Sequence, residues 1–136
     1  MRRAATLLAT AAFAIAGCGG GGPADDAKSA VKSYLNAFVE GDGAKACSLM
    51  TNATRAQFVK RTKPLTKTSD CAGAIEEIRT QAGQTAMDTL KKVKISSAKV
   101  NGDSADVRLT AGSSSTTAKL KKEGGEWKVT GAPGTQ

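Results

Sequence analysis

The sequence predicts a single domain of the α+β class, in which N-terminal helices pack on a four-stranded antiparallel sheet. Between residues 25 and 90, apolar side chains recur at spacings of three and four, which is the period of a helix buried on one face. From about residue 92 onward, apolar and polar side chains alternate, which is typical of strands. Because the helices all precede the strands, the pattern favours α+β over repeated β-α-β units. The length of 136 residues suits one such domain and not two.

The helical half divides into four expected helices. They are placed at residues 25–40, 44–50, about 52–60 and 71–90. Gly41 is the expected stop of the first helix, and Asp42 is the expected cap of the second. Pro64 cannot continue a helix, so a loop is expected at residues 61–68. Gly83 weakens the fourth helix and marks a place where it could break.

Four strands are expected after residue 92, joined by three tight turns. Asn101-Gly102 is a strong hairpin signal, because both residues tolerate the backbone angles of a type I′ turn. The other turns are expected at residues 112–115 and 123–126. The alternation slips by one residue between Ile95 and Val100, which indicates a bulge or a bend in the first strand.

The N-terminal residues are typical of an export signal. Residues 1–3 carry two arginines, and an uncharged run of 13 residues follows at 4–16, too short to span a bilayer. The segment Ile15-Ala16-Gly17-Cys18 then resembles the lipobox of bacterial lipoproteins, with small residues before a cysteine. That resemblance implies a signal peptide at residues 1–17 and a diacylglyceryl group on the Cys18 thiol. Residues 14–16 also fit an A-x-A cleavage site, which would instead give a plain secreted protein.

These boundaries lead to a full division of the chain. Residues 18–24 are expected to form the lipidated cysteine and a glycine-rich tether, residues 25–130 the folded domain, and residues 131–136 a flexible tail. Two acyl chains on Cys18 would bury enough methylene groups for stable anchoring in a bilayer. The expected location is therefore the outer face of the cell membrane, with the lipid bilayer as a partner.

The chain has three cysteines, at positions 18, 47 and 71. If Cys18 carries lipid, Cys47 and Cys71 are left to form a disulfide in an oxidising compartment. Two buried free thiols, which behave as small apolar groups, remain the alternative.

The composition excludes several kinds of catalytic site. The sequence has no histidine, so it cannot hold a Ser-His-Asp triad, a Cys-His pair or a histidine-ligated metal. No metal site and no cofactor are expected. The formal net charge is +8, but the lysines of the strands alternate with apolar residues and no aromatic residues interleave with them. We therefore expect a solvated basic face and no binding of nucleic acid.

The order of elements resembles the nuclear transport factor 2-like superfamily, and especially its small actinobacterial-type lipoproteins. The resemblance rests on residues 30–47, on Cys71, and on the hairpin segments at 100–107 and 120–129. It implies a cystatin-like cone, in which a curved antiparallel sheet wraps around the first helix. Ketosteroid isomerases and polyketide cyclases of this superfamily place an Asp, Tyr or His inside the cone. Here Asp106 is expected to face water and Asp88 has no obvious partner, so no catalytic residue is assigned.

The interior of the expected cone has named candidates. Val31, Leu35 and Phe38 of the first helix should face the apolar residues of the sheet. That set is Val107, Leu109, Leu120 and Trp127. Tyr34, Phe38 and Trp127 are the candidate pocket residues, with Tyr34 either a packed core residue or a hydroxyl donor at the mouth of the cone.

These observations favour a membrane-anchored extracytoplasmic lipoprotein that is not an enzyme. Its domain would bind an apolar small molecule or dock on an envelope protein. One alternative is an isomerase- or cyclase-like enzyme with a carboxylate inside the cone, which would need a raised pKa in an apolar pocket. The other alternative is the plain secreted protein described above.

Overall fold

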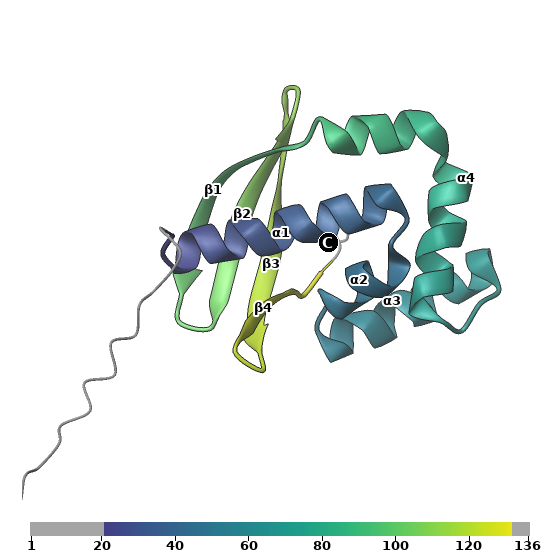
Figure 1. The fold of residues 1–136 in the computed structure, drawn as a ribbon, viewed down its shortest axis with the longest axis horizontal. Coiled ribbons are helices and arrows are strands. Elements are labelled where there is room, and N and C mark those ends of the chain that lie inside the picture. The colour runs from purple at the N-terminus through teal and green to yellow at the C-terminus, as the bar shows by residue number, and fades with distance from the viewer. Residues whose placement is uncertain (1–20, 132–136) are drawn as a thin grey trace, which may run out of the picture.

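A computed structural model describes residues 21–131, and these fold as four helices followed by one antiparallel sheet (Figure 1). In chain order the elements are α1 (Pro23–Glu40), α2 (Gly43–Ser48), α3 (Asn52–Thr66), α4 (Cys71–Lys91), β1 (Lys94–Asn101), β2 (Ser104–Ala111), β3 (Ser114–Glu123) and β4 (Glu126–Val129). The α+β expectation is confirmed. The expected signal peptide, Cys18 and the tail after residue 131 lie outside the described residues.

Helix α1 crosses one face of the sheet, and the sheet curls around it as expected for a cone (Figure 1). The strands follow one another in the order β1-β2-β3-β4, so each pairs with its neighbours in sequence. Helices α2 and α3 and the first part of α4 gather around the C-terminal end of α1, and the last part of α4 runs back toward the sheet (Figure 1). The described fold is therefore a sheet with α1 on its inner face and a helical cluster at one end.

Helix α1 begins at Pro23, two residues before the expected start, so the expected tether overlaps its first turn. A proline suits this position because the first N–H groups of a helix have no helical partner to lose. The helix ends at Gly41, whose φ of 81° lies in the left-handed region where a side chain would be strained. The Asp42 side chain then accepts a hydrogen bond from the Lys45 amide at 3.1 Å and caps α2, as predicted.

The loop expected at residues 61–68 is wrong, because α3 continues through Pro64 to Thr66. The proline lies in the last turn of the helix, so its missing N–H deprives only the Lys60 carbonyl of a helical donor. Lys60 is exposed, and water can bond to that carbonyl. Lys67 ends the helix in a left-handed conformation with φ of 56°, and its amide bonds to the Lys63 carbonyl at 2.9 Å.

Helix α4 breaks at Gly83, where φ is 80° and ψ is 174°. Glycine tolerates this backbone conformation, which an L side chain would disfavour. The break occurs at the residue where the sequence indicated that one was possible. Ile75 is buried before it, Ala82 is exposed, and Met87 is buried in the second half. The break turns residues 84–91 back across the end of the sheet (Figure 1).

The apolar residues that alternate along the strands share the buried face of the sheet. Val107 pairs with Ala98 on one side and with Ala118 on the other, and the side chains of Val107 and Ala118 are both buried. The register shifts between Ile95 and Ser97, which confirms the irregularity expected in the first strand. Strand β4 also forms a parallel bridge from Val129 to Met50, which ties the end of the sheet to the segment between α2 and α3.

The buried apolar residues form two clusters. The sheet cluster lies between α1 and the strands, and its members are Ala27, Val31, Ala105, Val107, Leu109, Ala118, Leu120 and Trp127. The helical cluster lies among α1, α2, α4 and the end of β4, and its members are Tyr34, Ala37, Ala46, Cys47, Met50, Cys71, Ile75 and Val129. Both clusters include residues of α1, which therefore joins them.

Val31 and Leu35 face the sheet as expected, but Phe38 does not join them there. Phe38 is partly buried and packs against the helical cluster. Phe38 lies three positions after Leu35, beyond the sheet cluster and in the part of α1 that the other helices surround.

A disulfide joins Cys47 of α2 to Cys71, the first residue of α4, with a sulfur–sulfur distance of 2.03 Å. It closes a loop over a sequence separation of 24 residues, which contains the whole of α3. Such a cross-link lowers the conformational entropy of the unfolded chain in the loop-closure model.

Reduction of this disulfide should destabilise the domain. From the loop length and the behaviour of small secreted domains that lose a disulfide, we expect the free energy of unfolding to fall by about 2–5 kcal/mol. Urea unfolding followed by circular dichroism, with and without reductant, measures the change. The double variant Cys47→Ala/Cys71→Ala is the control, since reductant should leave its unfolding midpoint unchanged. Equal midpoints for the oxidised and reduced native sequence would contradict the prediction.

Candidate functional site

An apolar cavity of about 450 Å³ lies between the C-terminal half of α1, the helical cluster and the tip of the β2–β3 hairpin. Its volume falls in the range of small-molecule sites in proteins. The residues that line it are Tyr34, Leu35, Phe38, Phe58, Ile78, Leu90, Val93, Leu109, Thr110, Ala111, Ser114, Ser115 and Thr116. None of these residues is charged, and the polar members carry only hydroxyl groups. We call this space the apolar cavity.

Three aromatic side chains form the wall opposite the hairpin. Tyr34 and Phe38 are one helical turn apart on α1, and Phe58 comes from α3. Aromatic rings offer large apolar surfaces with few rotatable bonds, so they make a stiff wall for an apolar ligand.

Tyr34 is 5% exposed, and burial raises the pKa of its hydroxyl to about 12. The Tyr34 hydroxyl has no hydrogen-bond partner among residues 21–131. In that range, every side-chain nitrogen or oxygen atom that is fully enclosed does have a partner. The hydroxyl therefore keeps some accessible surface, and Tyr34 is one of the residues that line the apolar cavity. It can donate a hydrogen bond to a ligand there.

The rim contributed by the sheet is made of small residues. Ala111 and Ser114 pair across the end of the β2–β3 hairpin, and Ser115 and Thr116 continue β3. A bulkier set at these positions would fill the space in front of Phe38. The sequence marked this stretch only as a serine-rich turn, so its contribution to a cavity was not predicted.

A second cavity, of about 640 Å³, runs along the other side of α1. It lies between α1 and the junction of α4 with β1, and we call it the basic groove. Its lining residues are Asp25, Lys28, Ser29, Lys32, Leu35, Asn36, Val39, Leu90, Lys91, Val93, Lys94 and Ile95. Four lysines and one aspartate give it a positive charge. Sequence reasoning missed it, because its lysines come from three separate elements.

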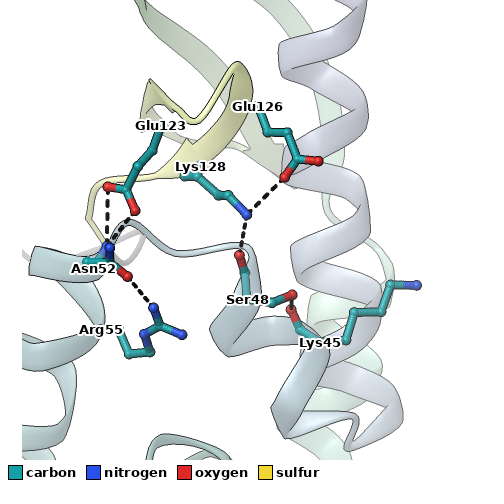
Figure 2. Close-up of polar contacts among 7 residues, drawn as sticks. All are labelled: Lys45, Ser48, Asn52, Arg55, Glu123, Glu126 and Lys128. Atoms are coloured by element: carbon teal, nitrogen blue, oxygen red, sulfur yellow. Dashed lines mark hydrogen bonds and ion pairs between the residues drawn. The ribbon is translucent and has the colours of Figure 1, made fainter.

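Polar contacts hold α3, and with it Phe58, in place against the β3–β4 hairpin (Figure 2). The Glu123 carboxylate accepts hydrogen bonds from the Asn52 amide at 3.2 and 3.3 Å, at the start of α3. A carboxylate is favourable there because the helix dipole is positive at its N-terminus. The Asn52 side chain also accepts a hydrogen bond from Arg55 (Figure 2).

The same hairpin is fixed to α2 by Lys128 (Figure 2). Its ammonium group donates to the Ser48 carbonyl at 2.6 Å and pairs with Glu126 at 3.2 Å. The Lys128 side chain is only 17% exposed, so this ammonium group is more shielded from solvent than a typical surface lysine. Backbone bonds from Val129 to Leu49 at 2.7 Å and from Thr51 to Val129 at 3.0 Å complete the attachment.

Trp127, expected at the pocket, lines neither cavity. It is 7% exposed and belongs to the sheet cluster. The Lys122 ammonium group lies 5.2 Å from the centre of its ring, a cation–π contact. The alternation of β4 places Trp127 and Val129 on the buried face together, so this ring fills the core between strand and helix.

The isomerase-like alternative requires a carboxylate in the apolar cavity, and no carboxylate lines it. All twelve acidic residues of the sequence lie in the described part, and all are exposed except Glu123, which is intermediate. Asp106 faces solvent as expected. Asp88 is exposed as well. A hydrogen bond from Gln84, and to a smaller extent one from Lys91, lowers the pKa of its carboxyl group.

None of the helices within residues 21–131 is long and apolar enough to cross a membrane. No group of three or more histidine, cysteine, aspartate or glutamate residues in that range is arranged to hold a metal ion. Cys18, the expected lipidation site, lies outside the described residues.

The titration of Tyr34 tests its burial directly, because it is the only tyrosine in the sequence. In the folded protein the phenolate absorbance should appear with a midpoint near pH 12, and in denaturant near pH 10. The unfolded state loses this proton at a lower pH than the folded state does. The titration of Tyr34 should therefore lower the free energy of unfolding as the pH rises from about 10 to about 12, and should not change it with pH below that window.

The Tyr34→Phe variant is the control, because it carries the same lysines but no phenol. Its stability should fall less steeply than that of the native sequence over the same pH window. A phenolate midpoint near pH 10 while circular dichroism still reports a folded protein would show that the hydroxyl is not buried.

The family comparison places this chain among proteins of one uncharacterised family. The family model that matches is described as a domain of unknown function, DUF4878, and it matches residues 16–130. No curated protein and no solved structure gives a significant match. Because residues 16–130 make up most of the sequence, the chain belongs to the family described as the domain of unknown function DUF4878.

Proposed function

We propose that this protein is a membrane-anchored extracytoplasmic lipoprotein whose domain binds an apolar small molecule without converting it. The observation that carries the binding role is the apolar cavity of about 450 Å³, with its aromatic wall and uncharged lining. Open apolar surface of this kind is costly to leave in water, and a ligand that covers it gains about 25 cal/mol for each Å² buried.

A non-catalytic role is supported by the chemistry of that lining. Its polar groups are the hydroxyls of Tyr34 and of the serines and threonines near the hairpin. At neutral pH these groups can donate and accept hydrogen bonds, but none of them is a ready base or an activated nucleophile. Such a set orients a ligand. Docking of an envelope protein is the weaker form of the proposal, because a concave cavity suits a small molecule better than a protein surface.

The anchoring role is supported by the Ile15-Ala16-Gly17-Cys18 box behind a short apolar run. Four residues separate Cys18 from Pro23, where α1 begins. Even a fully extended backbone would span at most roughly 18 Å over this distance. A lipid on Cys18 would therefore hold the start of α1 close to the outer surface of the bilayer.

The finer family assignment is also part of this proposal. A sheet that curls around one long helix is what the resemblance to nuclear transport factor 2-like proteins implies. In that architecture the space between helix and sheet is where small ligands are held, and the apolar cavity occupies the corresponding place between α1 and the β2–β3 hairpin.

Lipid attachment is tested by metabolic labelling. Cells that express the full chain and receive a labelled fatty acid should incorporate the label into this protein, and the Cys18→Ser variant should take up none. The membrane fraction should contain the native sequence and lose the variant. Cys47→Ala/Cys71→Ala is the matched control, since it removes two cysteines and should remain labelled. Label on the Cys18→Ser variant, or secretion of the unlabelled native protein, would contradict the anchor.

Ligand binding is tested with N-phenylnaphthylamine, a neutral probe that fluoresces in apolar surroundings. The native protein should bind it, and Ala111→Phe should weaken binding at least about tenfold by filling the apolar cavity. Ala82→Phe is the matched control, because Ala82 is exposed and lines neither cavity. If the two variants bind the probe equally well, the probe does not occupy the apolar cavity and the proposal fails.

A further inference from the structure

We propose that the ligand is a single-chain anionic amphiphile, with its hydrocarbon chain in the apolar cavity and its acidic head group in the basic groove. This inference rests on the proposed function and names the class of molecule that the site would take. The head group can be a carboxylate, a sulfate or a phosphate, since each is an anion that ammonium groups bind.

The two cavities adjoin one another. Leu35, Leu90 and Val93 line both of them. Leu35 lies on α1 between the stripe that faces the basic groove and the stripe that faces the apolar cavity. Leu90 and Val93 lie at the junction of α4 with β1. All three are only partly buried, so the partition between the two spaces is a thin apolar one.

The helical period of α1 explains this arrangement. One side of the helix carries Lys28, Lys32, Leu35 and Asn36. Residues three or four positions apart lie on the same side of a helix, and Asn36 directly follows Leu35. Tyr34 and Phe38 lie on the neighbouring side. One helix therefore presents a cationic stripe and an aromatic stripe that meet at Leu35, which matches the two ends of an amphiphile.

Two of the four lysines in the basic groove have no acidic partner in the described structure. Lys28 pairs with Asp25 at 2.7 Å, and Lys91 pairs with Asp88 at 3.2 Å. Lys32 and Lys94 form no ion pair within residues 21–131, and both are exposed at the edge of the groove. They come from different elements, Lys32 from α1 and Lys94 from β1, so both can contribute to the attraction of an anion in the basic groove.

The charge should add selectivity rather than most of the affinity. The groove is open to solvent, where the attraction between single charges is weak and is screened by salt. We expect an anionic head group to tighten binding about tenfold over a neutral head group at low ionic strength. The hydrocarbon chain should supply the rest by covering the aromatic wall.

A matched series of ligands tests this with the full protein. Decyl phosphate, decanol and decyltrimethylammonium share one chain and differ in charge, and each can displace N-phenylnaphthylamine below its micelle concentration. Decyl phosphate should bind about tenfold more tightly than decanol, and decyltrimethylammonium should bind more weakly than either. The preference for the anion should shrink in about 1 M salt, where the screening length falls to roughly 3 Å.

The variant Lys32→Gln/Lys94→Gln should bind decyl phosphate no better than decanol, with its affinity for decanol unchanged. Lys45→Gln/Lys60→Gln removes the same charge from exposed positions on α2 and α3 that line neither cavity, and it should keep the preference. Equal binding of decyl phosphate and decanol by the native protein would overturn this inference and leave the proposed function standing. A preference that survives Lys32→Gln/Lys94→Gln would place the head group elsewhere and would also overturn it. Failure of all three ligands and of the neutral probe to bind would overturn the proposed function itself.

Discussion

The packing of α1 across the inner face of the sheet is the interaction on which the rest of the fold depends. Its N-terminal half buries Ala27 and Val31 against the strands, and its C-terminal half buries Tyr34 and Ala37 among the other helices. Small side chains at Ala27, and at Ala105 and Ala118 on the strands, let helix and sheet approach closely at one end. Because α1 contributes to both clusters, any element that shifts relative to it loses buried apolar contact. The apolar cavity and the basic groove lie along this helix and take their shape from it.

The apolar cavity exists because few large side chains lie beyond the close contact between α1 and the sheet. Aromatic residues make up only 4% of the chain, and those among the described residues are divided between a core ring, Trp127, and the cavity wall. At the hairpin tip the sheet contributes the small residues Ala111 and Ser114 to the lining. A sequence with larger residues at that tip would close the space and gain stability. The open space is thus a consequence of small residues at particular positions.

The sequence predicted the elements where local chemistry decides the structure and failed where packing decides it. Gly41 and Asp42 end and begin helices through their own backbone and side chain, and the slip at Ile95 is visible in the alternation itself. Pro64 misled because the cost of a proline depends on its place in the helix, and the true end of α3 is set by Lys67. Trp127 was assigned to the pocket, although alternation fixes only which face it occupies and not what lies opposite. The basic groove joins α1 to residues 90–95, a proximity that no local pattern contains.

The walls of the apolar cavity are not held equally firmly. The α3 wall lies within the loop that the Cys47–Cys71 disulfide closes, and its first residue is held by the contacts of Glu123. Beyond the break at Gly83, residues 84–91 bury only Met87, so this part of α4 has little apolar contact to lose if it moves. Leu90, at its end, lines both cavities. A ligand that bridges them would therefore contact a wall with little buried apolar surface, while α1 and the sheet keep the opposite wall in place. Differences in chain length among ligands would be accommodated mainly by this segment of α4, and differences in head group by the lysines beside it.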